Sequence, residues 1–231
     1  MATFVFIHGA ADVGWYWHLL EAELQARGHD TVAPDLPCDD DTAGLNEYAD
    51  TVVEAIGDRA DVLVVGHSLG GFTAPIVADR VSANALVLVA GMIPAPGEPP
   101  DDWWENTGYK SASDAHAKQE GYADQKDDPF VTFYNGVPRV LAEEAMSKER
   151  GQSSTWMAGP WPLNAWPDVP TKFVVCRDDR FFPPDFLRRL AQARLGITPD
   201  EIDGGHCAAL SHPRELADVL ESYSMNISMN M

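Results

Sequence analysis

Residues 62–72 constrain the fold more than any other part of the chain. An apolar, β-branched run stops at Gly66, presents Ser68, and continues through Gly70 into small residues that suit a helix. A serine at such a sharp strand-to-helix turn must adopt a strained backbone conformation, and the flanking glycines let the chain pass close to itself. The stretch therefore predicts a buried strand, a nucleophile elbow at Ser68 and a helix over Thr73–Val81.

The same turn also predicts chemistry. A helix that begins just after Ser68 directs its free backbone NH groups toward the turn, where they would stabilise negative charge on a substrate oxygen. The bare pattern Gly-x-Ser-x-Gly arises by chance often enough to be weak evidence alone. Its place between a buried strand and an Ala/Val-rich helical stretch favours the catalytic interpretation, with Ser68 as nucleophile.

Strand and helix patterns alternate along much of the chain. Short apolar runs predict strands at Phe4–Ile7, Thr31–Ala33, Val62–Val65, Asn84–Val89, Thr171–Cys176 and Glu201–Asp203. Apolar residues at helical spacing predict helices over Trp15–Arg27, Leu45–Ile56, Pro184–Leu195 and His212–Tyr223. This alternation predicts an α/β fold, a mostly parallel sheet with helices on both faces.

The alternation breaks between residues 92 and 170. This part begins with a cluster of prolines and ends in a second segment rich in proline and tryptophan. We expect it to be an inserted cap over the ends of the strands, so that residues 1–91 and 171–224 form the core. Residues 225–231 are expected to form a flexible tail.

The composition excludes several classes of function. A formal net charge of -20 repels phosphate backbones and anionic membrane surfaces, so nucleic acid and membrane are not expected partners. We interpret the acidity chiefly as a means of keeping the surface solvated. Since the chain starts with neither a basic segment nor a long apolar one, no export signal is visible and a cytoplasmic location is expected.

The three cysteines argue against both a disulfide framework and a structural zinc site. Cys38, Cys176 and Cys207 are odd in number and show no CxxC spacing. They are expected to be reduced thiols, and no metal site is expected.

A serine nucleophile requires a base, which should follow the acid in the chain. Only His206 and His212 come after the strand predicted at 171–176, and His206 follows two glycines in a loop that could reach the elbow. His206 is therefore the predicted base, whereas His212 is expected to cap or line the last helix. His8 and His67 are expected to be structural hydrogen-bonding residues.

The acid should lie in the turn after Cys176, where Asp178 and Asp179 compete. The turn resembles that of the α/β-hydrolase superfamily, which commonly reads Gly-x-x-Asp-x-x-x-Pro. Aligning Pro183 with the final proline implies Asp179 as the acid, although Cys176 stands where the superfamily has glycine. For the oxyanion hole, Leu69 supplies one backbone NH group, and the resemblance implies Ala10 as the second donor.

Further motifs specify the branch of the superfamily. Phe4-Val-Phe-Ile-His-Gly-Ala10, Gly14-Trp-Tyr-Trp17, Ala33-Pro-Asp-Leu36 and Gly66-His-Ser-Leu-Gly-Gly71 resemble the small plant-type methylesterases and hydroxynitrile lyases with their bacterial esterase relatives. The better-known lyases carry a threonine and a lysine where this chain has Gly9 and Cys207. The resemblance therefore implies ester hydrolysis rather than cyanohydrin cleavage.

These features predict a serine hydrolase with a Ser68, Asp179 and His206 triad that cleaves esters of small apolar or aromatic substrates through an acyl-enzyme. No cofactor is required, and the expected partner is a small-molecule ester. The alternatives are hydroxynitrile lyase or carbon-carbon bond hydrolase chemistry on the same triad, and a non-catalytic receptor for a small ligand. The oligomeric state stays open, with a homodimer among the options. Candidates for lining the pocket are Trp103, Trp104, Phe130, Phe133, Tyr134, Trp156, Phe181 and Phe182.

Overall fold

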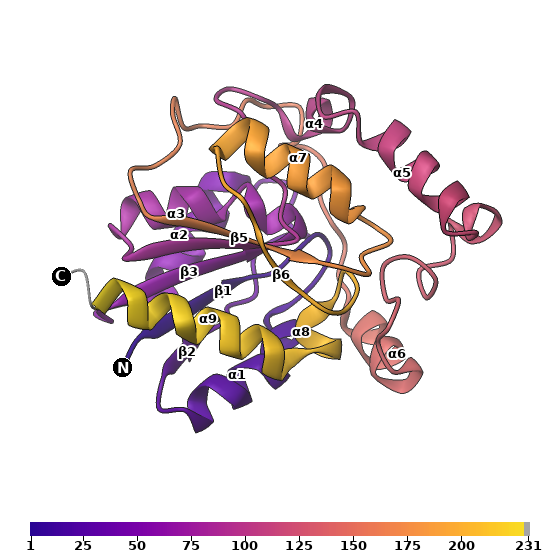
Figure 1. Ribbon diagram of the computed structural model, residues 1–231. Coiled ribbons are helices and arrows are strands. Elements are labelled where there is room, and N and C mark those ends of the chain that lie inside the picture. The colour runs from indigo at the N-terminus through magenta and orange to yellow at the C-terminus, as the bar shows by residue number, and fades with distance from the viewer. Residues whose placement is uncertain (229–231) are drawn as a thin grey trace.

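The computed structural model describes residues 1–228, and for 226–228 it describes the backbone alone. Its centre is a six-stranded sheet in the order β2-β1-β3-β4-β5-β6, in which every neighbouring pair is parallel (Figure 1). The strands are β1 Thr3–Ile7, β2 Asp30–Val32, β3 Val62–His67, β4 Ala85–Val89, β5 Thr171–Cys176 and β6 Asp200–Ile202. This arrangement confirms the predicted α/β fold.

The central strands are apolar along their whole length because both faces of the sheet are covered. All residues of β1, β3 and β4 are buried. On one face lie α1 (His18–Ala26) and α9 (Pro213–Ser228), which contact each other, and on the other lie α2 (Leu45–Ile56), α3 (Ala74–Arg80) and α7 (Pro184–Leu195) (Figure 1). Short helical turns complete the core: η1 (Gly14–Trp17), η2 (Ser68–Gly71) and α8 (Ala208–Ser211).

Helix α3 (Ala74–Arg80) agrees with the predicted range Thr73–Val81 to within one residue at each end, but no α-helix begins directly after Ser68. The four residues Ser68–Gly71 form a 3-10 turn, and the α-helix starts at Ala74. Pro75 lies in the first turn of α3, where its missing NH group has no partner to lose and its fixed φ favours helix initiation. The elbow is thus a tight turn of its own rather than the first turn of a long helix.

Residues 92–170 contain four helical segments and no strand. These are α4 (Pro100–Asn106), α5 (Tyr109–Gln119), η3 (Ala123–Gln125) and α6 (Arg139–Lys148), and Figure 1 shows α5 and α6 beside the body of the sheet. Hydrogen bonds join this segment to the rest of the chain, among them a buried one from Trp161 Nε1 to the Phe72 carbonyl at 2.9 Å and a partly buried one from Arg194 Nη2 to Glu98 Oε1 at 2.8 Å. The division into a core and a cap remains a prediction.

The end of the chain differs from the expected tail. Helix α9 continues through Ser228, so residues 225–228 are helical, while 229–231 lie outside the described residues. The helix can continue because no glycine or proline follows Pro213, and Leu216, Leu220 and Tyr223 are buried at helical spacing.

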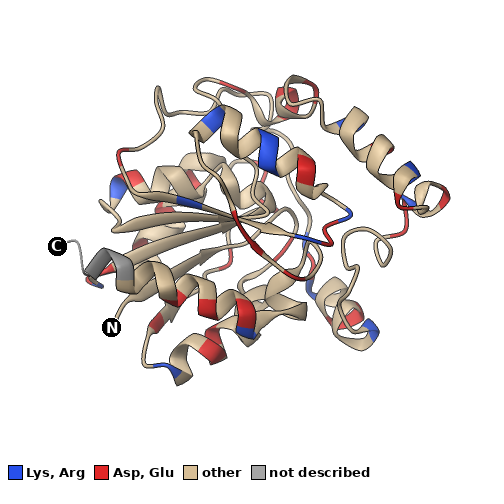
Figure 2. Ribbon diagram, in the orientation of Figure 1, with Lys and Arg blue, Asp and Glu red and all other residues tan. Residues whose placement is uncertain are grey.

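The acidic side chains are distributed over the outer helices and loops (Figure 2). Among the described residues no helix is both long and apolar enough to cross a membrane. The carboxylates are thus spread over the surface, where water can solvate them.

Candidate active site

The candidate site lies where the winding of the sheet changes direction. Strands β1 and β3 pair side by side, with Ile7 opposite Gly66, while β2 lies outside β1 and β4 lies outside β3. The chain therefore leaves these two strands toward opposite edges of the sheet, which leaves a crevice at their carboxyl ends. The loop that begins at His8 and the elbow at Ser68 meet there.

Ser68 has the backbone conformation expected of a strained elbow. Its φ of 51° lies in the left-handed region, which side-chain-bearing residues rarely adopt. The turn depends on neighbouring glycines: a Cβ on Gly66 would lie 2.7 Å from the Ala74 Cβ, and one on Gly70 would lie 2.7 Å from the Ile7 carbonyl oxygen. Only glycine fits at these two positions, so sequence and backbone geometry agree here.

Asp179 and His206 form a buried pair. His206 Nδ1 lies 2.8 Å from Asp179 Oδ2, and both side chains are fully buried. The other oxygen, Asp179 Oδ1, accepts hydrogen bonds from the backbone NH groups of Phe181 and Phe182, each at 2.8 Å. Asp178, the competing carboxylate, is exposed, and its Oδ2 accepts a hydrogen bond from the Gly204 NH group at 3.2 Å.

The remaining nitrogen of His206 is unbonded. Nε2 is buried and has no hydrogen-bond partner among the described residues. Three aromatic rings enclose the imidazole, with centroid distances of 4.9 Å to Phe133, 4.8 Å to Phe181 and 5.1 Å to Phe182. Within the described part of the chain no hydrogen bond joins His206 to Ser68, but the ring of His67, the residue before the nucleophile, lies 4.7 Å from the His206 ring.

The loop after β1 is held in place by His8. Its Nδ1 donates to the Gly9 carbonyl at 2.8 Å and its Nε2 accepts from the Leu36 NH group at 3.0 Å, a pattern that requires the neutral ring. Burial lowers the pKa of His8 to about 4, which keeps the ring neutral. A Cβ on Gly9 would lie 3.1 Å from the Ser68 Cβ, so the loop runs directly past the elbow.

The two predicted oxyanion donors lie on either side of this contact. Ala10 follows Gly9 and is exposed, whereas Leu69 is the second residue of η2, where helical NH groups lack partners within the helix. The next residue, Ala11, forms two hydrogen bonds with residues 150–152. Its NH group donates to Gln152 Oε1 at 3.1 Å, and its carbonyl accepts from the Arg150 NH group at 2.8 Å.

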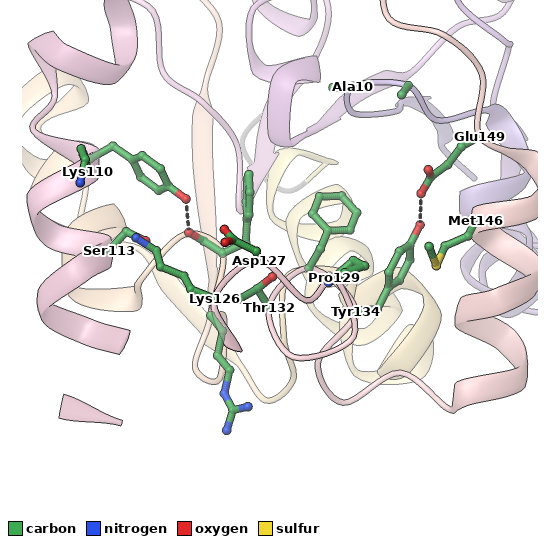
Figure 3. A pocket seen from close by; sticks show the side chains of 15 residues that line it. Ala10, Lys110, Ser113, Lys126, Asp127, Pro129, Thr132, Tyr134, Met146 and Glu149 are labelled. Carbon is green, nitrogen blue, oxygen red and sulfur yellow. Dashed lines mark hydrogen bonds between the residues drawn. The ribbon is translucent and has the colours of Figure 1, made fainter. Parts of the chain in front are cut away.

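A cavity of about 580 Å³ opens beside Ala10 and the aromatic cover of His206 (Figure 3). Of the predicted aromatic residues, Phe133, Tyr134 and Phe181 line it. Trp103 and Phe182 are instead fully buried in the core. Trp156 lines a separate void of about 10 Å³ on the side of the elbow that carries Leu69.

The structure adds lining residues that the sequence pattern did not indicate. Tyr109 lines the cavity, and its hydroxyl donates to the Phe181 carbonyl at 2.9 Å. At the opposite end the Tyr134 hydroxyl donates to Glu149 Oε1 at 2.7 Å, and burial together with this bond raises the pKa of Tyr134 (Figure 3). In the sequence, only the aromatic character of Tyr109 could have indicated that it lines the cavity. Glu149 lies in no recognisable motif.

One further acidic residue lies close to this loop. Asp12 is buried, and its Oδ1 accepts a hydrogen bond from the Val13 NH group at 2.9 Å. Burial, together with the charges of Glu149 and Asp35, raises the pKa of the Asp12 carboxyl to about 7. The carboxyl therefore titrates near neutral pH only a few residues from a predicted oxyanion donor.

Cys38, Cys176 and Cys207 are free and buried. Among the described residues no group of three or more His, Cys, Asp or Glu side chains is arranged to hold a metal ion.

Comparisons with known proteins agree with this architecture. Residues 4–219 match the model of the alpha/beta hydrolase family. The chain is 32% identical to Methylesterase 7 of Arabidopsis thaliana and 25% identical to Probable esterase PIR7A of Oryza sativa subsp. indica, each time over 94% of both chains. Among solved structures, polyneuridine aldehyde esterase superposes with a TM-score of 0.78 at 20% identity, covering 97% of this chain and 99% of that one.

Proposed function

Because the chain belongs to the alpha/beta hydrolase family, we propose that it is a serine hydrolase that cleaves carboxylic esters of small apolar or aromatic substrates. The observation that carries this proposal is the buried pair of Asp179 and His206: His206 Nε2 is unbonded among the described residues, and the His206 ring lies 4.7 Å from the ring of His67, which directly precedes a serine in a strained elbow. The esterases among the relatives support the same reaction class.

In the proposed first step Ser68 Oγ attacks the ester carbonyl carbon, and His206 Nε2 takes up the hydroxyl proton. Asp179 holds the proton of Nδ1, so that Nε2 is the basic nitrogen, and it stabilises the imidazolium that forms. The NH groups of Ala10 and Leu69 bind the oxyanion of the tetrahedral intermediate. The elbow is suited to this step because η2 begins at the nucleophile itself.

In the second half His206 gives its proton to the departing alcohol, which leaves Ser68 esterified by the acyl group. Water then attacks the acyl-enzyme carbonyl while His206 takes its proton, and collapse of the second tetrahedral intermediate releases the acid and restores Ser68. As the second intermediate collapses, His206 returns its proton to Ser68 Oγ. No further co-reactant is required, because water supplies the hydroxyl group of the acid and the proton that replaces the one passed from Ser68 to the alcohol.

Two spaces of very different volume, one lined by Ala10 and the other by Leu69, favour esters whose two substituents differ in size. The cavity of about 580 Å³ has aromatic walls and suits the bulky, apolar part of the ester. The void of about 10 Å³ on the Leu69 side has room for little more than a methyl group unless Trp156 moves. We therefore expect esters with one large and one very small substituent to be the better substrates.

The test is pre-steady-state hydrolysis of p-nitrophenyl acetate by the wild-type chain and by Ser68→Ala. We expect a burst of nitrophenol followed by steady turnover in the wild type and neither in the variant. A Ser68→Ala protein with wild-type turnover would exclude the mechanism, and a wild-type protein without burst or turnover on any ester tested would favour a ligand-binding role.

A further inference from the structure

His67, the residue just before the predicted nucleophile, packs against both the His206 ring and the loop at Gly9. Its imidazole is fully buried and stacks on Tyr16, with centroids 4.8 Å apart and planes 17° apart. The ring of His206 lies 4.7 Å from it, and the ring of Trp17 lies edge-on to it at 6.1 Å. A Cβ on Gly9 would lie 3.5 Å from His67 Nδ1, so the oxyanion loop also packs against this ring.

A hydrogen bond joins His67 to the backbone of His206. His67 Nε2 lies 2.9 Å from the His206 carbonyl oxygen, and since a carbonyl only accepts, Nε2 must carry the proton. Burial, followed by the charge of His206, holds the pKa of His67 well below its usual range. The ring is therefore a neutral donor, and its Nδ1 has no hydrogen-bond partner among the described residues.

Among the described residues this is the one hydrogen bond that joins His206 to β3. Asp179 holds the imidazole through Nδ1, and the aromatic rings limit its rotation. These contacts fix the side chain relative to the acid turn, but not its backbone relative to β3. The bond from His67 connects the carbonyl of His206 to the strand that ends at the nucleophile.

We propose that His67 is a positioning residue that sets the distance between His206 Nε2 and Ser68 Oγ through the hydrogen bond to the His206 carbonyl. The inference rests on the proposed function, because it assigns His206 as the base. The rate of proton transfer from Ser68 Oγ to His206 Nε2 depends on this distance, because a displacement of about 1 Å can reduce the rate of a catalysed step by about 100-fold. Binding of the ester in the cavity does not depend on it.

The experiment compares His67→Gln, His67→Asn and His67→Phe in p-nitrophenyl acetate hydrolysis. The glutamine amide nitrogen is as many bonds from Cα as His67 Nε2 and keeps the donor, whereas the asparagine nitrogen stands where Nδ1 stands and falls short of the carbonyl. Phenylalanine retains a stacking ring without a donor. His29→Phe is the matched control, because His29 is a largely buried histidine that packs on the edge of Phe4, away from Ser68.

We expect kcat to fall about 10- to 100-fold in the Asn and Phe variants and to stay within about 3-fold of wild type in the Gln variant, with KM unchanged throughout. His29→Phe should retain the wild-type kcat. If His67→Phe does not fold, the Gln and Asn pair decides alone, since both place an amide in the same buried space.

Equal kcat values for the Gln and Asn variants, or a rise in KM in place of a fall in kcat, would overturn the inference. Failure of the proposed function has a different signature: the wild-type chain would not turn over esters, or Ser68→Ala would retain activity. The two hypotheses can therefore fail separately.

Discussion

Asp179 and His206 are joined by a 2.8 Å hydrogen bond between two fully buried side chains, although 27 residues separate them in the chain. The carboxylate also accepts two backbone NH groups, so its orientation is fixed by the turn that carries it. We expect this buried carboxylate to orient the imidazole of His206 rather than to stabilise the fold.

Replacement of Asp179 should therefore be far more damaging than replacement of its neighbour. We expect Asp179→Asn to lower kcat by about 1,000- to 10,000-fold, since the amide would favour the wrong tautomer of His206. Asp178→Asn should stay within about 3-fold of wild type, because Asp178 is exposed and retains an acceptor for the Gly204 NH group. Steady-state kinetics with one ester decide the matter, and a larger loss in the Asp178 variant would contradict the assignment.

The strained conformation of Ser68 should be measurable as stability. At a φ of 51° a Cβ is unfavourable, so the free energy of unfolding of Ser68→Gly should exceed that of Ser68→Ala by about 1 kcal/mol. Both variants lack the hydroxyl, which makes them a matched pair for denaturant titration. Ser82→Gly against Ser82→Ala, at a φ of 49°, is the control outside the site and should show the same sign. Equal stability of the two Ser68 variants would show that the turn is not strained.

Asp12 should make stability decrease with pH. Its pKa is raised from 3.8 to about 7, so between these values the folded chain binds a proton that the unfolded chain has released. Stability therefore falls as pH rises from about 4 to 7, by at most about 4 kcal/mol.

Asp12→Asn keeps an acceptor for the Val13 NH group and removes the titration. The variant should match the wild type near pH 4 and exceed it near pH 8 in urea unfolding. A constant difference between the two proteins across this range would exclude the titration of Asp12 as the cause.

The cavity should discriminate esters by size. Met146 lines it from α6, and Met146→Trp should raise KM about 10-fold for an aryl ester with a bulky acyl group while leaving methyl acetate unaffected. Val140→Trp on the same helix is the control, because Val140 is 79% exposed and does not line the cavity. A similar change in KM for both esters, or in both variants, would show that this cavity does not hold the substrate.

Local pattern was sufficient for much of the fold. The ranges predicted for α2, β5 and α7 coincide with those of the structure, because each is an apolar run or stripe bounded by glycine or proline. The short turns η2 and α8 were not predicted. Turns of four residues contain too few positions for a periodic signal, and contacts from distant segments decide their geometry.

The candidate site was predictable where the signal lies within a few neighbouring residues. Ser68 and its glycines form such a signal. Asp178 and Asp179 are adjacent and chemically identical, so local sequence cannot distinguish them, and the packing of the fold decides which one is buried. The cavity is the extreme case: Tyr109 is positioned by a bond to Phe181, 72 residues away. The roles of Ser68, Asp179, His206, Ala10 and Leu69 in catalysis remain predictions.

The start of residues 92–170, the segment predicted to be an inserted cap, forms a backbone hydrogen bond with the elbow. The Met92 NH group donates to the Ser68 carbonyl at 2.9 Å, and a Cβ on Gly71 would lie 1.9 Å from the Met92 carbonyl oxygen. A chimera that exchanges this segment for that of a relative should therefore retain Met92 as part of the recipient. If the junction lay before Met92, the graft would replace a residue whose backbone packs against Ser68 and Gly71. A junction after Met92 would leave this backbone contact intact.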